Sequence, residues 1–218
     1  MQWKRNAKIT FVITAKNQGT WVKIFLDDMA KFLRQTGDSN VDIIIFDYES
    51  QDLDLKKAVR DSGIGHRIKT VGKPGRYSRR ESFNMAIDLV DDPHKIVFLV
   101  DLHLKFGEAL LNDIRKHTIE GHLIYCPIIV RQFECSTLNN LFAGYYGYYE
   151  VQGFGIVAMY KSDWDRVGGF TMDDKNKYKW GGDDYDLMDS VYLRGLDYAR
   201  VKCPYVYHFF HSKDGMWS

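Results

Sequence analysis

The chain has 218 residues, of which 45% are hydrophobic and 27% are charged, and its formal net charge is +1. This composition is that of a single globular domain with a substantial core, and the small net charge argues against bulk binding to nucleic acid or to an anionic membrane. No segment approaches the ~18 consecutive apolar residues of a membrane span. The N-terminal sequence lacks the apolar core of a signal peptide, so we expect any secretory targeting segment to lie outside this chain.

Strand-like and helix-like segments alternate through the first half of the chain. Short apolar runs rich in β-branched residues predict strands, whereas apolar residues at helical spacing predict helices. The predicted strands are 8–15, 41–47, 66–71 and 95–101, and the predicted helices are 21–35, 53–62 and 79–90. This alternation predicts an α/β fold with a mostly parallel sheet that is covered by helices on both faces.

The pattern changes after about residue 125. Segments rich in glycine and tyrosine lead to one further predicted strand near 155–160 and to a predicted helix over 185–194. We find no internal repeat and no linker, so the chain is expected to form one domain.

The three cysteines are Cys126, Cys135 and Cys203. Because their number is odd, at most one internal disulfide can form, and their spacing is not that of a metal-binding knuckle. Buried free thiols are at least as consistent with the sequence, so the cysteines leave the redox compartment open.

The predicted strand over 95–101 ends in an Asp-Leu-His triplet, Asp101 to His103. Ligands of open α/β sheets bind at the carboxyl ends of the strands, and side chains two residues apart on an extended chain point the same way. The pair could therefore hold a metal or a sugar nucleotide. A helix-capping aspartate beside a surface histidine is an equally good interpretation of the triplet alone.

A second histidine cluster lies near the C-terminus, where His208 and His211 flank two phenylalanines. The spacing of three brings the two side chains together on a helical turn or a bend. Neutral imidazole suits Mn, Co, Zn or Fe better than Mg or Ca. Alone, the pair is better explained as core or surface histidines, but together with His103 and Asp101 it could complete a metal site.

Two adjacent carboxylates, Asp183 and Asp184, follow a Trp-Gly-Gly segment and precede the last predicted helix. Taken alone, they are acids favoured at a helix N-terminus by the helix dipole. This segment is nevertheless one of five that occur in a definite order: YSRRESFN (77–84), FLVDLHL (98–104), GFGIVAMYKSDWDRVGGF (153–170), KWGGDDYDL (179–187) and HFFHSKDGMW (208–217). This ordered set resembles the β-1,4-galactosyltransferase and β-1,4-N-acetylgalactosaminyltransferase family, and its N-acetylgalactosaminyltransferase branch above all.

The resemblance extends from about residue 8 to the C-terminus and implies a GT-A fold. It implies one catalytic domain, in which about 1–104 binds a nucleotide sugar and about 105–218 binds acceptor and metal. Asp101 would lie near the ribose and diphosphate, while His103, His208 and His211 would hold the metal, for which Mn²⁺ is expected. The family has Asp-x-Asp and Met-x-x-His where this chain has Asp-x-His and His-x-x-His, so another divalent transition metal is possible.

The resemblance also implies an inverting glycosyl transfer from a UDP-sugar. Such a reaction needs a general base for the acceptor hydroxyl and an electrophile for the leaving diphosphate. By similarity, Asp184 is the base and Asp183 lies near the sugar hydroxyls. Trp180 offers a ring face to the acceptor, and Gly181 and Gly182 let the backbone approach it.

The donor would be bound by Tyr77, which faces the uracil, and by Arg79, which faces the diphosphate. Gly153 stands where the galactosyltransferases carry a tyrosine that crowds the 2-position of the donor sugar. A glycine leaves room for an N-acetyl group, which favours UDP-GalNAc over UDP-Gal. The alternative is that Gly153 serves only a turn.

The acceptor is expected to end in GlcNAc, in a β1-4 linkage, with a glucuronate-terminated chondroitin chain as the alternative. Two further interpretations stay open: a retaining enzyme like the polypeptide GalNAc-transferases, and a catalytically silent GT-A module that assists an active partner. No nucleic-acid partner and no membrane contact within this chain are expected. The resemblance implies the Golgi lumen as the location.

Overall fold

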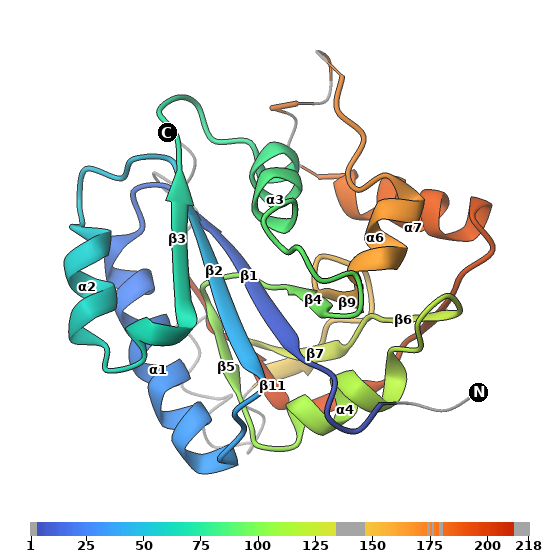
Figure 1. Ribbon diagram of the computed structural model, residues 1–218, viewed down its shortest axis with the longest axis horizontal. Coiled ribbons are helices and arrows are strands. Elements are labelled where there is room, and N and C mark those ends of the chain that lie inside the picture. Colours follow the sequence, from blue (N-terminus) through green and yellow to red (C-terminus); the bar gives the residue numbers. More distant parts are fainter. Residues whose placement is uncertain (1–3, 134–146, 174, 176, 179–180, 212–218) are drawn as a thin grey trace.

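The protein is described here by a computed structural model, which covers residues 4–133, 147–173, 175, 177–178 and 181–211. A seven-stranded sheet forms its centre, in the order β10-β6-β9-β4-β1-β2-β3 (Figure 1). The strands are β1 (Ile9–Ala15), β2 (Val41–Asp47), β3 (Ile68–Gly72), β4 (Ile96–Leu99), β6 (Leu123–Tyr125), β9 (Val157–Tyr160) and β10 (Asp197–Ala199). β1 to β4 run parallel to one another, and β9 is antiparallel to β4. The predicted mostly parallel sheet is confirmed.

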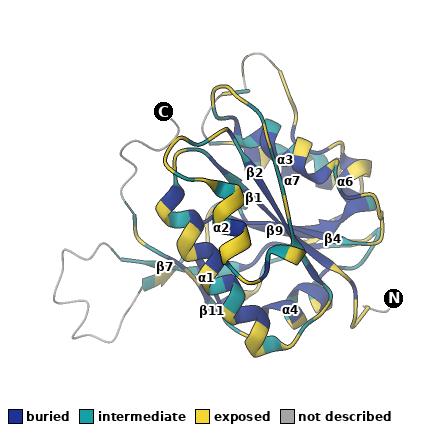
Figure 2. Ribbon diagram, turned by 60° about the vertical axis from the view of Figure 1, so that its left-hand side comes forward, coloured by how far each residue is buried: buried dark blue, intermediate teal, exposed yellow. Residues whose placement is uncertain are grey.

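Helices cover both faces of this sheet, as predicted (Figure 1). They are α1 (Gly19–Thr36), α2 (Leu55–Asp61), α3 (Arg79–Ile87), α4 (Leu110–His117), α6 (Lys161–Val167) and α7 (Asp183–Leu193). In Figure 2, α1 and α2 carry buried residues on one side and exposed residues on the other. Within the part of the chain that the structure describes, no helix is long and apolar enough to span a membrane.

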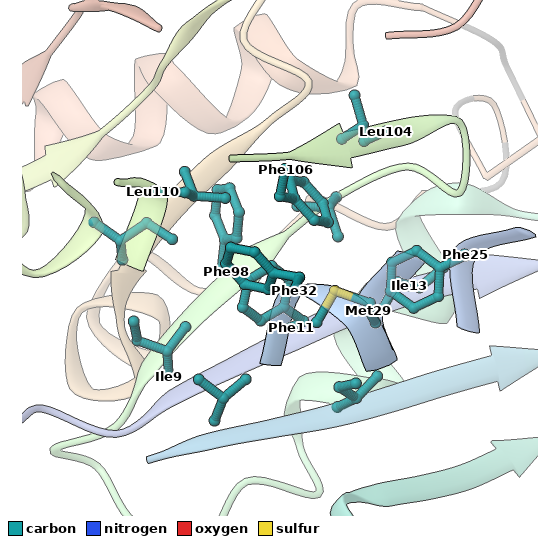
Figure 3. Packing of buried hydrophobic residues seen from close by; sticks show 14 of the residues in the cluster. Ile9, Phe11, Ile13, Phe25, Met29, Phe32, Phe98, Leu104, Phe106 and Leu110 are labelled. Atoms are coloured by element: carbon teal, nitrogen blue, oxygen red, sulfur yellow. The ribbon is translucent and has the colours of Figure 1, made fainter. Parts of the chain in front are cut away.

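Side chains of β1 alternate between two separate cores, because successive residues of a strand point to opposite faces. Phe11 belongs to the core under α1, α2 and α4, whereas Val12 belongs to the core under α3, α6 and α7. Figure 3 shows the first core, in which four rings from β1, α1, β4 and β5 (Leu104–Phe106) pack together. These rings are Phe11, Phe32, Phe98 and Phe106, with centroids 5.2 to 6.4 Å apart in the contacting pairs.

A second, four-stranded sheet was not expected from the sequence. Its order is β5-β11-β7-β8, with β7 (Ile128–Gln132), β8 (Gly147–Tyr149) and β11 (Lys202–His208) beside β5. Phe209 N–H donates to the carbonyl of His103 at 2.8 Å, just beyond the β11–β5 ladder. This sheet therefore brings the two ends of the predicted histidine site together.

Two of the three cysteines are buried free thiols. Cys203 belongs to the core under α1, and its Sγ lies 2.8 Å from the hydroxyl of Tyr125. Cys126 belongs to the opposite core, and burial raises the pKa of its thiol to about 12. Cys135 lies outside the described residues.

Candidate active site

A cleft of about 780 Å³ opens beside the carboxyl ends of β1 and β4. The chain runs from β1 outward through β2 to β3 but returns to β4 on the other side of β1, so the cleft lies at a topological switch point of the sheet. Every predicted site residue that the structure describes lines it. These residues are Tyr77, Arg79, Asp101, His103, Gly153, Gly181, Gly182, Asp183, Asp184, His208 and His211. The remaining one, Trp180, lies outside the described residues.

Three histidines from distant parts of the chain gather at one end of the cleft. His103 lies in the turn between β4 and β5, His208 ends β11, and His211 follows three residues later. One nitrogen from each lies within 4.8 Å of the other two, and the rings of His103 and His211 are stacked with centroids 3.7 Å apart. The predicted metal-binding trio therefore comes together.

The chemistry of these imidazoles suits a divalent transition metal. His103 is buried, and its Nε2 has no hydrogen-bond partner among the described residues. Burial, followed by the nearby His211 and His208, lowers the pKa of His103 to about 3, which keeps the ring neutral and able to ligate. His208 Nδ1 donates to the carbonyl of Phe209 at 2.8 Å, which leaves Nε2 as its ligand atom.

Trp21, from the first turn of α1, forms a wall behind these histidines. Its ring lies edge-on to His103 at 4.6 Å and to His211 at 5.9 Å, and it stacks on Phe209 at 6.0 Å. Sequence reasoning assigned Trp21 only to a helix, because nothing in its spacing connects it with histidines more than 80 residues away. Trp21 thus packs against two of the three histidines and against Phe209, which lies between His208 and His211 in the chain.

The reason given for pairing Asp101 with His103 was wrong, although both residues line the cleft. The predicted strand over 95–101 ends at Leu99, and the triplet forms a turn before β5. The two side chains meet the cleft because the chain turns into it. Asp101 raises the pKa of His208 electrostatically, against the larger lowering by burial, so the net direction is downward.

Tyr77 and Arg79 lie at the start of α3, on the other side of Asp101. The Tyr77 hydroxyl is 2.8 Å from Thr14 Oγ1, and burial raises its pKa to about 12, so the phenol stays neutral. Arg79 pairs with Asp183 and donates from Nη2 to the carbonyl of Gly155 at 2.7 Å. Burial lowers the pKa of Arg79, but the Asp183 and Asp101 carboxylates raise it more.

The carboxylate pair stands at the N-terminus of α7, which begins two residues before the predicted helix. Gly181 and Gly182 have φ of 81° and 80°, a left-handed conformation that glycine adopts without strain. Asp183 is buried against Arg79, whereas Asp184 Oδ2 accepts a hydrogen bond from the Phe154 amide at 2.6 Å. The two neighbouring carboxylates thus face different partners.

Gly153 lies directly against Asp184. Its φ is 77°, and a Cβ at this position would be 3.3 Å from Asp184 Oδ2. Gly153 therefore has a backbone role. This role is compatible with the expectation that the glycine also leaves space for a donor N-acetyl group. Any side chain here would strain the backbone and press on the carboxylate.

Arg200 holds the segment that carries Gly153, and sequence reasoning missed it. Its two terminal nitrogens donate to the carbonyls of Gly153 and Val151, both at 2.7 Å, and its guanidinium lies 4.3 Å from the centroid of the Phe154 ring. Arg200 follows β10, at the edge of the sheet. The segment that contacts Asp184 is thus fixed to the central sheet.

Comparison with known proteins identifies the family. The family described as chondroitin N-acetylgalactosaminyltransferase matches residues 1–215. The chain is 38% identical over 218 residues to mouse N-acetyl-beta-glucosaminyl-glycoprotein 4-beta-N-acetylgalactosaminyltransferase 1, an alignment that covers 100% of this chain and 20% of the relative. The chain thus spans about a fifth of that protein's length.

Solved structures agree in fold. S. aureus TarS in complex with UDP-GlcNAc has a TM-score of 0.68 at 11% identity, over 95% of this chain and 60% of that one. A Drosophila β1,4-galactosyltransferase 7 mutant in complex with manganese, UDP-Gal and xylobiose has a TM-score of 0.60 at 13% identity, over 95% of this chain and 72% of that one. The resemblance stated from the motifs is confirmed: the chain has the GT-A glycosyltransferase fold and belongs to the chondroitin N-acetylgalactosaminyltransferase family.

Proposed function

We propose that this chain transfers GalNAc from UDP-GalNAc to a terminal GlcNAc, with inversion at the anomeric carbon and a β1-4 linkage. The observation that carries the proposal is the orientation of Asp184 by the Phe154 amide, in the same cleft as the histidine trio. The relative that is 38% identical has a name describing GalNAc transfer to a GlcNAc-bearing glycoprotein. That agreement supports both the donor and the acceptor.

Asp184 is the general base in this proposal. Its Oδ2 is occupied by the Phe154 amide, so Oδ1 takes the proton of the acceptor 4-hydroxyl. The acceptor oxygen attacks the anomeric carbon of GalNAc as the bond from that carbon to the diphosphate oxygen breaks, and the electron pair leaves with UDP. The Phe154 amide keeps the carboxylate in one rotamer, which lowers the cost of reaching this geometry.

His103, His208 and His211 would hold a divalent transition metal, with Mn²⁺ the first candidate because the solved Drosophila enzyme contains manganese. When bound, the metal would supply positive charge for the diphosphate. Arg79 adds a second cation on the same side, and Tyr77 provides the ring face for the base. Asp101 lies between these groups, where a ribose or diphosphate would pass. Asp183 would hold Arg79 in place and contact sugar hydroxyls.

The turnover assay that tests the proposal uses the 218-residue chain with UDP-GalNAc, Mn²⁺ and two acceptors, one ending in GlcNAc and one ending in glucuronate. We expect transfer to GlcNAc, with a β-anomeric product identified by NMR. An α-linked product would indicate a retaining enzyme, and preference for glucuronate would indicate a chondroitin reaction. UDP binding without turnover on either acceptor would indicate a silent module.

The Golgi lumen, implied by the resemblance, is the compartment we propose for the reaction.

Donor choice is tested at Gly153, and the structure requires an alanine control. Gly153→Ala should reduce turnover with both UDP-GalNAc and UDP-Gal about equally, because a left-handed residue with a Cβ costs roughly 1–2 kcal/mol and presses on Asp184. Gly153→Tyr should reduce use of UDP-GalNAc further, relative to UDP-Gal, since only the N-acetyl group collides with the ring. If Gly153→Tyr lost turnover equally with UDP-GalNAc and UDP-Gal, Gly153 would have only a backbone role and would not select the donor.

A further inference from the structure

Three aromatic rings stand near Asp184, one from α7, one from β10 and one from the segment that precedes β9. Tyr185 and Tyr198 both lie edge-on to Phe154, with ring centroids 5.7 and 5.4 Å from it and interplanar angles of 82° and 81°. Phe154 is half-buried between them, whereas Tyr185 is 52% exposed and Tyr198 is 47% exposed. We call these three residues the tyrosine platform.

The platform is held rigidly to the residue proposed as the base. Arg200 lies 4.3 Å from the Phe154 ring centroid and binds the two carbonyls of the preceding segment. The Phe154 amide donates to Asp184 at 2.6 Å, and Tyr185 directly follows Asp184 in α7. Phe154 thus connects the platform to Asp184 through its amide and to Arg200 through its ring. Tyr185 and Tyr198 are each about half exposed, so part of each ring surface remains accessible to a ligand.

The first turn of α7 separates the donor side of the cleft from this platform. Successive helical residues turn by about 100°, so Asp183, Asp184 and Tyr185 face three directions. Asp183 faces Arg79 and the nucleotide side, whereas Asp184 faces Phe154. In an inverting displacement the acceptor oxygen attacks opposite the leaving group. The acceptor would therefore lie on the Asp184 side of the donor, where Tyr185 lines the same cleft as the next residue of α7.

We propose that the tyrosine platform is an acceptor subsite, which binds the pyranose ring that follows the terminal acceptor sugar. The C–H face of a pyranose is apolar and can cover an aromatic ring, while the tyrosine hydroxyls remain available to sugar hydroxyls. This proposal rests on the proposed function and deepens it, because the chain would then contact at least two sugars of its acceptor. Acceptor length then contributes to specificity without any contact to the reacting hydroxyl.

The experiment compares methyl β-GlcNAc with the disaccharide GlcNAcβ1-4GlcNAc as acceptors for UDP-GalNAc. Tyr198→Ala should raise KM for the disaccharide about three- to tenfold, the range of one aromatic stacking contact, and should leave KM for the monosaccharide and kcat unchanged. Tyr198→Phe should retain most of the disaccharide affinity because it keeps the ring. Tyr192→Ala, which removes a 78% exposed tyrosine from the same helix as Tyr185, is the matched control.

Equal changes in KM for the two acceptors, or no change for either, would overturn the subsite while leaving the proposed function intact. A Tyr192→Ala effect as large as that of Tyr198→Ala would also overturn it. Failure of the wild-type chain to transfer GalNAc to either acceptor would instead refute the proposed function, and the subsite with it. Thermal denaturation of each variant shows whether a change in KM comes from misfolding.

Discussion

The histidine trio and the start of α7 lie in one cleft but are built in opposite ways. His103 and His208 are buried at 5% and 6% exposure, and burial lowers the pKa of both. The acids of α7 instead already have partners, since Asp183 pairs with Arg79 and Asp184 accepts from the Phe154 amide. One region presents a buried nitrogen, His103 Nε2, for which the described part of the chain supplies no hydrogen-bond partner, and the other presents carboxylates that are already oriented.

This difference separates what each region needs in order to work. The three imidazole nitrogens, gathered within 4.8 Å of one another, would gain their main interaction from the proposed cation, so this region would depend on a ligand. The start of α7 is oriented by the protein itself through Arg79, Phe154 and the segment that Arg200 holds. Metal removal and mutation should therefore affect the two regions separately.

The largest expected effect comes from Asp184→Asn, which keeps the shape of the side chain and removes its basicity. A positioned base contributes roughly 10²–10⁴-fold, so kcat should fall by about that factor while UDP and metal affinities stay near wild type. Steady-state kinetics and calorimetry with UDP and Mn²⁺ measure the two quantities separately.

Two neighbouring acids serve as controls for this prediction. Asp183→Asn breaks the pair with Arg79 and should raise KM for the donor or the acceptor more than it lowers kcat. Asp189→Asn, at an exposed position of the same helix, should change neither. If Asp183→Asn lost kcat and Asp184→Asn lost only KM, the base would be Asp183.

His211→Ala should act on the other region, with an intermediate effect. Removing one of the three proposed ligands should weaken metal-dependent UDP binding at least tenfold, or about 1.4 kcal/mol, in a calorimetric titration. His122→Ala, at an exposed position, is the matched control. UDP binding without metal should be the same in both variants. An unaltered metal titration for His211→Ala would remove the histidines from the metal site and erase the contrast between the two regions.

The smallest effect concerns the ion pairs of Glu81, one of which binds Lys177 in the segment before α7. Glu81 is bound by Lys177 and Lys73, both at 2.8 Å, and by the Tyr48 hydroxyl at 3.0 Å. Burial raises the pKa of Glu81, but these three partners lower it more, to about 2 from an ordinary 4.5. Because the folded pKa is the lower one, this stabilisation is complete above about pH 4.5 and is lost as pH falls toward 2.

Glu81→Gln should therefore lower Tm by about 3 °C at pH 7 and flatten the acid limb of the stability curve below pH 4.5. Thermal denaturation between pH 2 and pH 7 measures both the Tm at pH 7 and the loss of stability at acid pH. Glu108→Gln, at an exposed position, should retain the wild-type acid limb. A Glu81→Gln curve parallel to wild type would mean that the segment before α7 is not held by charge.

The regular half of the fold was predictable from sequence because its signals are local. The strands β1 and β2 are apolar runs with helices between them, and their predicted bounds differ from the observed ones by at most one residue. The second sheet escaped prediction because β5 and β8 have three residues each, and because β5 pairs with β11, near the other end of the chain. A strand of three residues is too short to show a detectable periodicity in the sequence.

The identities of the site residues were predictable, whereas their contacts were not. Motif order pointed to Asp184 and to the three histidines, and the cleft unites them. The Phe154 amide that binds Asp184 is a backbone group present in every sequence, 30 residues away from its partner. Arg200 reaches Gly153 across 47 residues, also through a backbone carbonyl. Only the folded arrangement reveals which backbone group faces which side chain.

The two buried cysteines allow the opening of the two helical layers, one on each face of the central sheet, to be followed separately. Cys203 reports on the core under α1 and Cys126 on the core under α3, and both are fully buried. A thiol reagent can label either one only after the layer above it opens, since burial also raises the pKa of both thiols and suppresses the reactive thiolate. In a Cys135→Ser background, labelling rates followed by mass spectrometry would time the two layers independently. Equal rates would mean that the sheet and both of its coverings come apart as one cooperative unit.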